Sequence, residues 1–122
     1  MKNPWVLLLG LAVVYALSFF VYFSSFQNQA HRWHADKLFH LAGGFLIAAL
    51  AASFFQTERW WVLGLAALLV GIGWEVLELF VNPWTYELTS PKEVLDMRDA
   101  LGDIIGDVFG AFVFWITLTG LK

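Results

Sequence analysis

The chain has 122 residues, enough for one domain. Hydrophobic residues make up 60% of it, charged residues 14%, and the mean hydropathy is +0.69, which excludes a soluble domain of this size because too little polar surface is available to cover a core. The net charge of −3 excludes a nucleic-acid-binding role, and the lack of cysteine excludes disulfides and cysteine-bound metals.

Four apolar segments follow one another, at residues 4–26, 38–55, 60–81 and 100–120. Each is close to the ~20 residues with which a helix crosses a hydrocarbon layer about 30 Å thick. Their unbroken apolar runs argue against the alternating strands of a membrane barrel. The first run is longer than the ~7–15 residues of a signal peptide and lacks a small-residue cleavage site, so we predict that it stays as a span. The expected fold is an all-α integral membrane protein, with four transmembrane helices in one antiparallel bundle over residues 1–122.

The connections between these segments are unequal in length. Residues 56–59 predict a tight antiparallel pair, whereas residues 27–36 and 82–98 form longer, polar loops. Four antiparallel spans place the two longer loops on one side of the membrane and both termini on the other. The count of positive charges leans slightly toward the loops as the cytoplasmic side. The short N-terminus with Lys2 leads us instead to expect the termini in the cytoplasm, for a multi-pass protein of the bacterial inner membrane.

The ionisable residues of the last three segments all fall toward the side of the longer loops. They are Asp36 and His40 at the start of the second segment, Glu75 and Glu78 near the end of the third, and Asp99, Asp103 and Asp107 at the start and in the first half of the fourth. At ~100° per residue, Asp36 and His40 point within ~40° of each other, as do successive aspartates, so these segments carry polar stripes. A rise of ~1.5 Å per residue places Glu75 and Asp107 roughly 10 Å below the rim. We expect the stripes to face one another.

Carboxylates at this depth require compensation. One charged Asp near the bilayer centre costs ~2.5–3.5 kcal/mol. Glu75, Glu78, Asp103 and Asp107 together cost on the order of 5–10 kcal/mol, comparable with the whole stability of a domain. The cations Lys37 and Arg98 at the mouth, with His40, are too few to balance the acids. Either several acids are protonated or a bound cation belongs among them.

Some of these residues fit structural roles equally well. Asp36 and Asp99 stand where helix caps stand. His40 can also be a packed histidine bonded to Asp36. Glycines accompany the polar stripes and predict close helix contacts; they are Gly102, Gly106 and Gly110 in the fourth segment, with Gly43, Gly44, Gly71 and Gly73 opposite them.

Three short blocks resemble a known family. They read DKLFHLAGGFL at 36–46, GIGWEVLELF at 71–80 and RDALGDIIGDVFGA at 98–111. In order and spacing they are similar to the VanZ-like family of small bacterial membrane proteins and related four-span families, over about two thirds of the chain. The resemblance implies the cell envelope as location and a link to glycopeptide-antibiotic resistance, but no reaction. Its pattern maps onto Asp36, Lys37, His40, Glu75, Glu78, Arg98, Asp99, Asp103 and Asp107. Position 78 is often an amide in that family, and the aspartate repeat allows two registers.

The first functional hypothesis is a metal-dependent enzyme or binder that acts on an envelope lipid or its phosphorylated head group. Carboxylates with one imidazole suit Mg²⁺, Mn²⁺, Ca²⁺ or Zn²⁺. The expected ligands are His40, Glu75, Glu78, Asp103 and Asp107, of which His40, Glu75 and Asp103 are also the expected catalytic residues. The expected substrate contacts at the mouth are Lys37, Arg98, Asp36 and Asp99.

Two other hypotheses stay open. Embedded acids beside a histidine are also typical of a small proton-coupled transporter, and a non-catalytic accessory protein needs no chemistry from these residues. Haem is not expected, because His40 is the only embedded histidine. The partner expected from the first hypothesis is a membrane lipid or a lipid-linked phosphate, with no nucleic acid. Homo-oligomerisation and enzymatic activity itself are left open.

Overall fold

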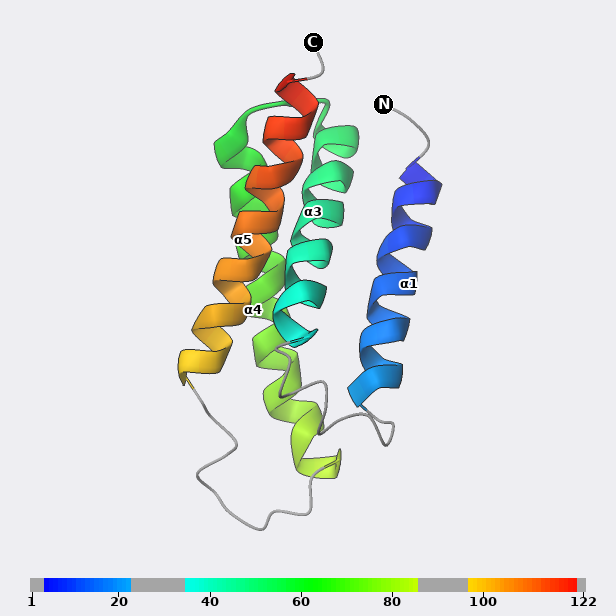
Figure 1. Ribbon diagram of the computed structural model, residues 1–122, viewed down its shortest axis with the longest axis vertical. Coiled ribbons are helices and arrows are strands. Elements are labelled where there is room, and N and C mark those ends of the chain that lie inside the picture. The colour runs from blue at the N-terminus through cyan, green and yellow to red at the C-terminus, as the bar shows by residue number, and fades with distance from the viewer. Residues whose placement is uncertain (1–3, 23–34, 86–96, 121–122) are drawn as a thin grey trace.

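The computed structural model describes residues 4–22, 35–85 and 97–120, and the side chains of residues 5–17, 37–77 and 100–120 within them. Helices make up nearly all of this part of the chain, and none of it is a strand. The helices are α1 (Pro4–Tyr22), α3 (Ala35–Phe55), α4 (Trp60–Thr85) and α5 (Met97–Gly120) (Figure 1). The all-α prediction is confirmed. The helices α4 and α5 extend beyond the predicted apolar segments, toward the loop that joins them.

Three stretches are long and apolar enough to cross a membrane. They are Lys37–Phe55 with 19 residues, Trp60–Leu77 with 18 and Ala100–Gly120 with 21. In α1 the described apolar stretch is Trp5–Leu17, which is shorter. The chain is therefore a multi-pass membrane protein, and the role of α1 as a fourth span stays a prediction.

Helix α3 is the centre of the bundle. It packs against each of the other three helices, and α5 also packs against α4. The helices α3 and α5 run in the same direction and α4 runs against them, while α1 stands beside α3 (Figure 1). The ring of Tyr15 in α1 also reaches Trp74 in α4, with a centroid distance of 4.7 Å. The first halves of α3 and α5 thus lie at the same end of the bundle as the second half of α4.

The connection between α3 and α4 is a compact turn, as the short segment predicted. Gln56 follows the last residue of α3 with a positive φ of 49°. The backbone N–H of Thr57 then donates to the carbonyl of Ala52 over 3.3 Å, which is the closing bond of a Schellman cap. The cap satisfies a carbonyl of the last turn of α3 and reverses the chain into α4.

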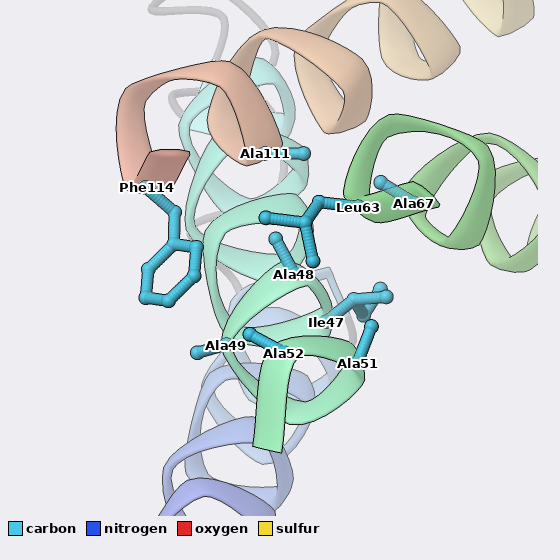
Figure 2. Packing of buried hydrophobic residues seen from close by; sticks show 9 residues of the cluster. All are labelled: Ile47, Ala48, Ala49, Ala51, Ala52, Leu63, Ala67, Ala111 and Phe114. Atoms are coloured by element: carbon cyan, nitrogen blue, oxygen red, sulfur yellow. The ribbon is translucent and has the colours of Figure 1, made fainter. Parts of the chain in front are cut away.

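An apolar core fills the end of the bundle next to this turn (Figure 2). Its residues are Ile47, Ala48, Ala49, Ala51, Ala52, Leu63, Ala67, Ala111 and Phe114. Six of these nine side chains are alanine, so the helices pack with little side-chain volume between them. The polar stripes lie toward the opposite ends of the same helices and are kept out of this core.

The outer surface is apolar, as contact with lipid requires. On α5 the exposed positions Leu101, Ile105 and Phe109 alternate with the buried Asp103 and Asp107 at helical spacing. Leu101 and Ile105 are 58% and 59% exposed, whereas Asp103 and Asp107 are 7% and 4% exposed. The polar face of α5 is therefore turned inward and its apolar face outward, the reverse of a surface helix in water.

Glycines bring α3 and α5 into backbone contact. A Cβ on Gly44 would collide with the carbonyl of Asp107, and a Cβ on Gly110 would collide with the carbonyl of Leu41. A Cβ on Gly106 would lie 3.3 Å from the Cβ of His40. These glycines therefore serve the predicted close packing, whereas Gly73 has no atom within 4 Å of such a Cβ and takes no part in it.

Substitution of these glycines tests the close contact. We expect Gly44→Ala and Gly110→Ala each to lower the free energy of unfolding by about 1–3 kcal/mol, because the added methyl overpacks the interface between α3 and α5. Gly64→Ala and Gly73→Ala are matched controls in α4 and should have little effect, since a Cβ at either position meets no atom within 4 Å. Unfolding in mixed detergent micelles, followed by circular dichroism, measures the difference. Equal losses in all four variants would contradict the contact.

Candidate functional site

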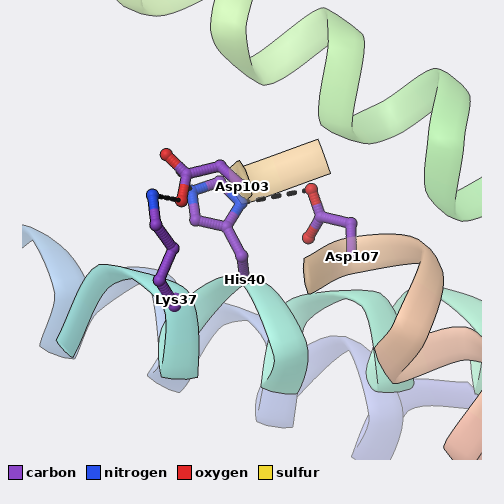
Figure 3. Close-up of polar contacts among 4 residues, drawn as sticks. All are labelled: Lys37, His40, Asp103 and Asp107. Atoms are coloured by element: carbon purple, nitrogen blue, oxygen red, sulfur yellow. Dashed lines mark hydrogen bonds and ion pairs between the residues drawn. The ribbon is translucent and has the colours of Figure 1, made fainter. Parts of the chain in front are cut away.

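Five ionisable side chains from three helices meet at the end of the bundle opposite the apolar core. They are Lys37 and His40 from α3, Glu75 from α4, and Asp103 and Asp107 from α5. We call them the polar cluster. Figure 3 shows that the ring of His40 stands between the two aspartates and that Lys37 reaches Asp103 from the adjacent turn of α3.

The position of His40 follows from the glycine between the aspartates. Gly106 has no side chain, so the α3 backbone at His40 can press against α5 at this point. Asp103 and Asp107 stand one turn apart and flank the ring: Nδ1 lies 3.1 Å from Oδ2 of Asp107, and Nε2 lies 3.8 Å from Oδ2 of Asp103. One imidazole thus contacts two buried carboxylates through its two nitrogens.

Lys37 makes a short contact within the polar cluster. Its Nζ donates to Oδ1 of Asp103 over 2.6 Å. The Asp103 side chain is 10% exposed and that of Lys37 is 31% exposed, so the ammonium reaches inward from the rim to a buried acid. The sequence placed Lys37 at the mouth as a contact for an anionic substrate. In the structure it compensates Asp103.

Asp107 is the more deeply buried of the two described aspartates of α5. A Cβ on Gly71 would lie 2.5 Å from its Oδ2, and a Cβ on Gly43 would lie 3.7 Å from its Oδ1. The carboxylate therefore fits against two glycines, one on α4 and one on α3, and His40 supplies its hydrogen bond. A Cβ at Gly71 would crowd the carboxylate, whereas one at Gly43 would make an ordinary contact, so the position of Asp107 depends on Gly71.

Glu75 completes the polar cluster from α4, and its Oε1 atom is buried. One ligand atom from each of His40, Glu75 and Asp103 lies within 4.8 Å of the others. The set contains one imidazole nitrogen and two carboxylate oxygens, a combination used for divalent metals in proteins. The prediction that stripes on these three helices face one another agrees with this geometry.

The charges of the polar cluster do not balance. Among the described side chains it holds one ammonium, from Lys37, against the three carboxylates of Glu75, Asp103 and Asp107. Protonated His40 would leave one excess negative charge. In apolar surroundings such an excess favours either proton uptake or a bound cation.

A small pocket adjoins the inner side of the polar cluster. Its volume is about 20 Å³, which is room for one water molecule. It is lined by Val14, Tyr15, Phe39, His40, Gly43, Trp74 and Asp107. The sequence reasoning missed Tyr15 and Trp74. Both residues lie inside apolar segments and not at the segment ends, where interfacial aromatic residues are expected, and this position could have indicated a role inside the bundle.

Four expected site residues lie outside the described side chains. They are Asp36, Glu78, Arg98 and Asp99. The alternative bond between His40 and Asp36 cannot therefore be compared, but the described partners of His40 are Asp103 and Asp107 on α5. Asp107 contacts Nδ1 of His40, whereas Asp103 lies near Nε2, so the two aspartates lie on different sides of the ring.

Comparison with known proteins identifies a family. The model of a family described as "Predicted membrane protein (DUF2238)" matches residues 4–122. Searches of the curated proteins and of the solved structures found no match. The family match supports the expected membrane protein and does not confirm the resemblance to the VanZ-like family.

A double-mutant cycle tests the pair formed by Lys37 and Asp103. Lys37→Met should lower the free energy of unfolding in metal-free buffer by about 1–3 kcal/mol, because it leaves a buried carboxylate uncompensated while the partial exposure of Lys37 limits the loss. In an Asp103→Asn background the same change should cost much less. Unfolding in mixed micelles measures the coupling, and Arg59→Met at the far end of the bundle is the charge-matched control. Identical losses in both backgrounds would show that the pair contributes nothing.

Proposed function

The chain belongs to the DUF2238 family of predicted membrane proteins, and we propose that it binds a divalent cation in the polar cluster and uses it on a phosphorylated lipid head group. The proposed ligands are His40, Glu75 and Asp103. The proposed location is the bacterial inner membrane with the termini in the cytoplasm. Whether the bound lipid is turned over or only held is part of the test below.

One observation carries the cation site, namely the convergence of three ligand residues from three helices within 4.8 Å. Ligand atoms bound to one ion at about 2.0–2.2 Å lie no more than about 4.4 Å apart. A small contraction of side chains therefore closes the set around an ion. The convergence is costly without a cation, because two of its members are carboxylates in apolar surroundings.

Asp107 supports His40 rather than adding a ligand. When Nδ1 carries the ring proton, it donates to Oδ2 of Asp107 across the 3.1 Å contact. Nε2 then presents its lone pair toward Asp103, another proposed ligand. A carboxylate that holds a ligating histidine in this way fixes its tautomer and its orientation. We therefore revise the expected role of Asp107 from metal ligand to orienting residue.

The substrate proposal follows from depth and charge. His40 lies one turn into the stretch Lys37–Phe55, and Asp103 lies one turn into the stretch Ala100–Gly120. A cation at this level is within reach of phosphate groups at the membrane surface. A divalent cation binds phosphate oxygens and can activate a water molecule beside them. A lipid phosphate is thus the ligand class that best suits a cation site near one membrane face.

Metal content tests the cation site. Protein purified in detergent and analysed by elemental analysis should contain a stoichiometric divalent metal, and Glu75→Gln or Asp103→Asn should lose it. Asp107→Asn should keep the site but bind about 10–100-fold more weakly, because it loosens the orientation of His40. Glu58→Gln is the matched control, since it removes an exposed glutamate at the other end of the bundle.

The outcomes separate the parts of the proposal. No metal in the wild type, or equal metal in the wild type, Glu75→Gln and Asp103→Asn, would overturn the cation site. If the metal is present, mass spectrometry of co-purified lipids tests the substrate class. Phosphorylated lipids should be enriched in the wild type over Asp103→Asn, and an identical lipid profile in both would overturn the lipid part.

A proton-coupled function is the second candidate, and a chain of contacts favours it. From the rim inward, Lys37 contacts Asp103 at 2.6 Å, His40 lies 3.8 Å further on, and Asp107 lies 3.1 Å from the other ring nitrogen. A histidine between two carboxylates can pass a proton by exchanging its tautomers. The pocket beside Tyr15 has room for a water molecule at the inner end of this chain.

Vesicles with an imposed potential test the second candidate. If the chain conducts protons, wild-type protein should acidify the lumen as reported by an enclosed pH-sensitive dye. His40→Gln and Asp107→Asn should both abolish the signal, whereas Glu58→Gln should not. An absence of flux in the wild type would leave the cation site as the better account of the same residues.

A further inference from the structure

The contact between Lys37 and Asp103 occupies a carboxylate that the proposed cation also needs. Nζ of Lys37 lies 2.6 Å from Oδ1 of Asp103, while Oδ2 of the same carboxylate faces His40. The stem of Lys37 passes over Gly102, whose absent Cβ would lie 3.3 Å from Cε and 3.4 Å from Nζ. The glycine thus gives the ammonium a path along α5 to the buried acid.

A divalent cation and an ammonium on one carboxylate repel each other strongly in a weakly polar site. Asp103 would bind either the ion or Lys37 well, but not both at full strength. We propose that Lys37 is an internal counter-ion that competes with the divalent cation for Asp103 and leaves it when the cation binds. This inference rests on the proposed function, because it concerns how the same site is regulated.

Lys37 is placed to make such a move. It is the first residue of the stretch Lys37–Phe55 that can span the membrane, and its side chain is 31% exposed. A lysine at the end of a span has a flexible stem that can carry its ammonium outward to the polar interface. Lys37 contacts Oδ1 of Asp103, as the dashed line in Figure 3 shows, whereas Nε2 of His40 lies 3.8 Å from the other oxygen, Oδ2. The departure of the ammonium therefore leaves His40 in place.

The carboxylates of the polar cluster are partly compensated both when Lys37 contacts Asp103 and when the cation is bound. With Lys37 on Asp103, one of the three carboxylates is compensated in the metal-free protein. With a divalent cation held by His40, Glu75 and Asp103, the ion compensates two carboxylates and Lys37 is no longer needed there. Asp107 keeps its contact with His40 in either state.

Mn²⁺ affinity tests the competition. The dissociation constant is measured by electron paramagnetic resonance on full-length protein in detergent, for the wild type and for Lys37→Met. Removing the competing charge should tighten Mn²⁺ binding about tenfold or more, because that charge acts over a few ångströms in a weakly polar site. Lys37→Arg keeps the charge and should bind like the wild type. The matched control Arg59→Met removes an exposed positive charge at the other end of the bundle and should also bind like the wild type.

The outcomes distinguish this inference from the proposed function. If Lys37→Met binds Mn²⁺ no more tightly than Arg59→Met, the competition is overturned while the cation site stands. If neither the wild type nor Lys37→Met binds Mn²⁺, both are overturned. If Lys37→Met does not fold, Lys37→Gln replaces it in the test. The glutamine amide can still donate to Asp103 but carries no charge, so this variant should also bind Mn²⁺ more tightly than the wild type.

Discussion

The backbone contact between α3 and α5 is the constraint on which the rest of the structure depends. Gly44 and Gly110 let the two helices touch, and Gly106 lets His40 press between Asp103 and Asp107. A wider separation would move the imidazole and the ammonium of Lys37 away from both aspartates. Each carboxylate would then stand charged in apolar surroundings at a cost of up to ~3 kcal/mol. The glycines therefore make the acids tolerable as well as making the helices pack.

Helix α3 divides the bundle into two ends with different physics. Its first half carries Lys37 and His40, and its second half carries four of the six alanines of the apolar core. The core end is held by close packing and by the capped turn at Gln56. The polar end adds ion pairs and a hydrogen bond to the glycine contacts between α3 and α5. A site that exchanges ligands is better placed at the second kind of end.

Much of this arrangement is predictable from the sequence, and the missing parts have physical reasons. Successive spans run in opposite directions. His40 and Asp103 lie near the start of their spans and Glu75 lies near the end of its span, so all three are predicted at the same end of the bundle. The pairing of Lys37 with Asp103 depends on the register of α3 against α5, which is set by where Gly102 and Gly106 meet α3. The spacing of residues within a single helix gives no information about that register. The position of Tyr15 beside the pocket was not predicted, because its apolar segment contains no acidic residue that would indicate a polar site nearby.

The division of labour between the two aspartates explains why both are present. Asp107 lies close against Gly71 and is buried, and its contact with His40 suits a fixed role. Asp103 lies one turn nearer the rim and contacts Lys37, whose side chain is partly exposed and has a long, flexible stem. Two carboxylates one turn apart on α5 can thus perform different tasks. The inner one contacts the imidazole, and the outer one contacts Lys37 and is a ligand of the proposed cation.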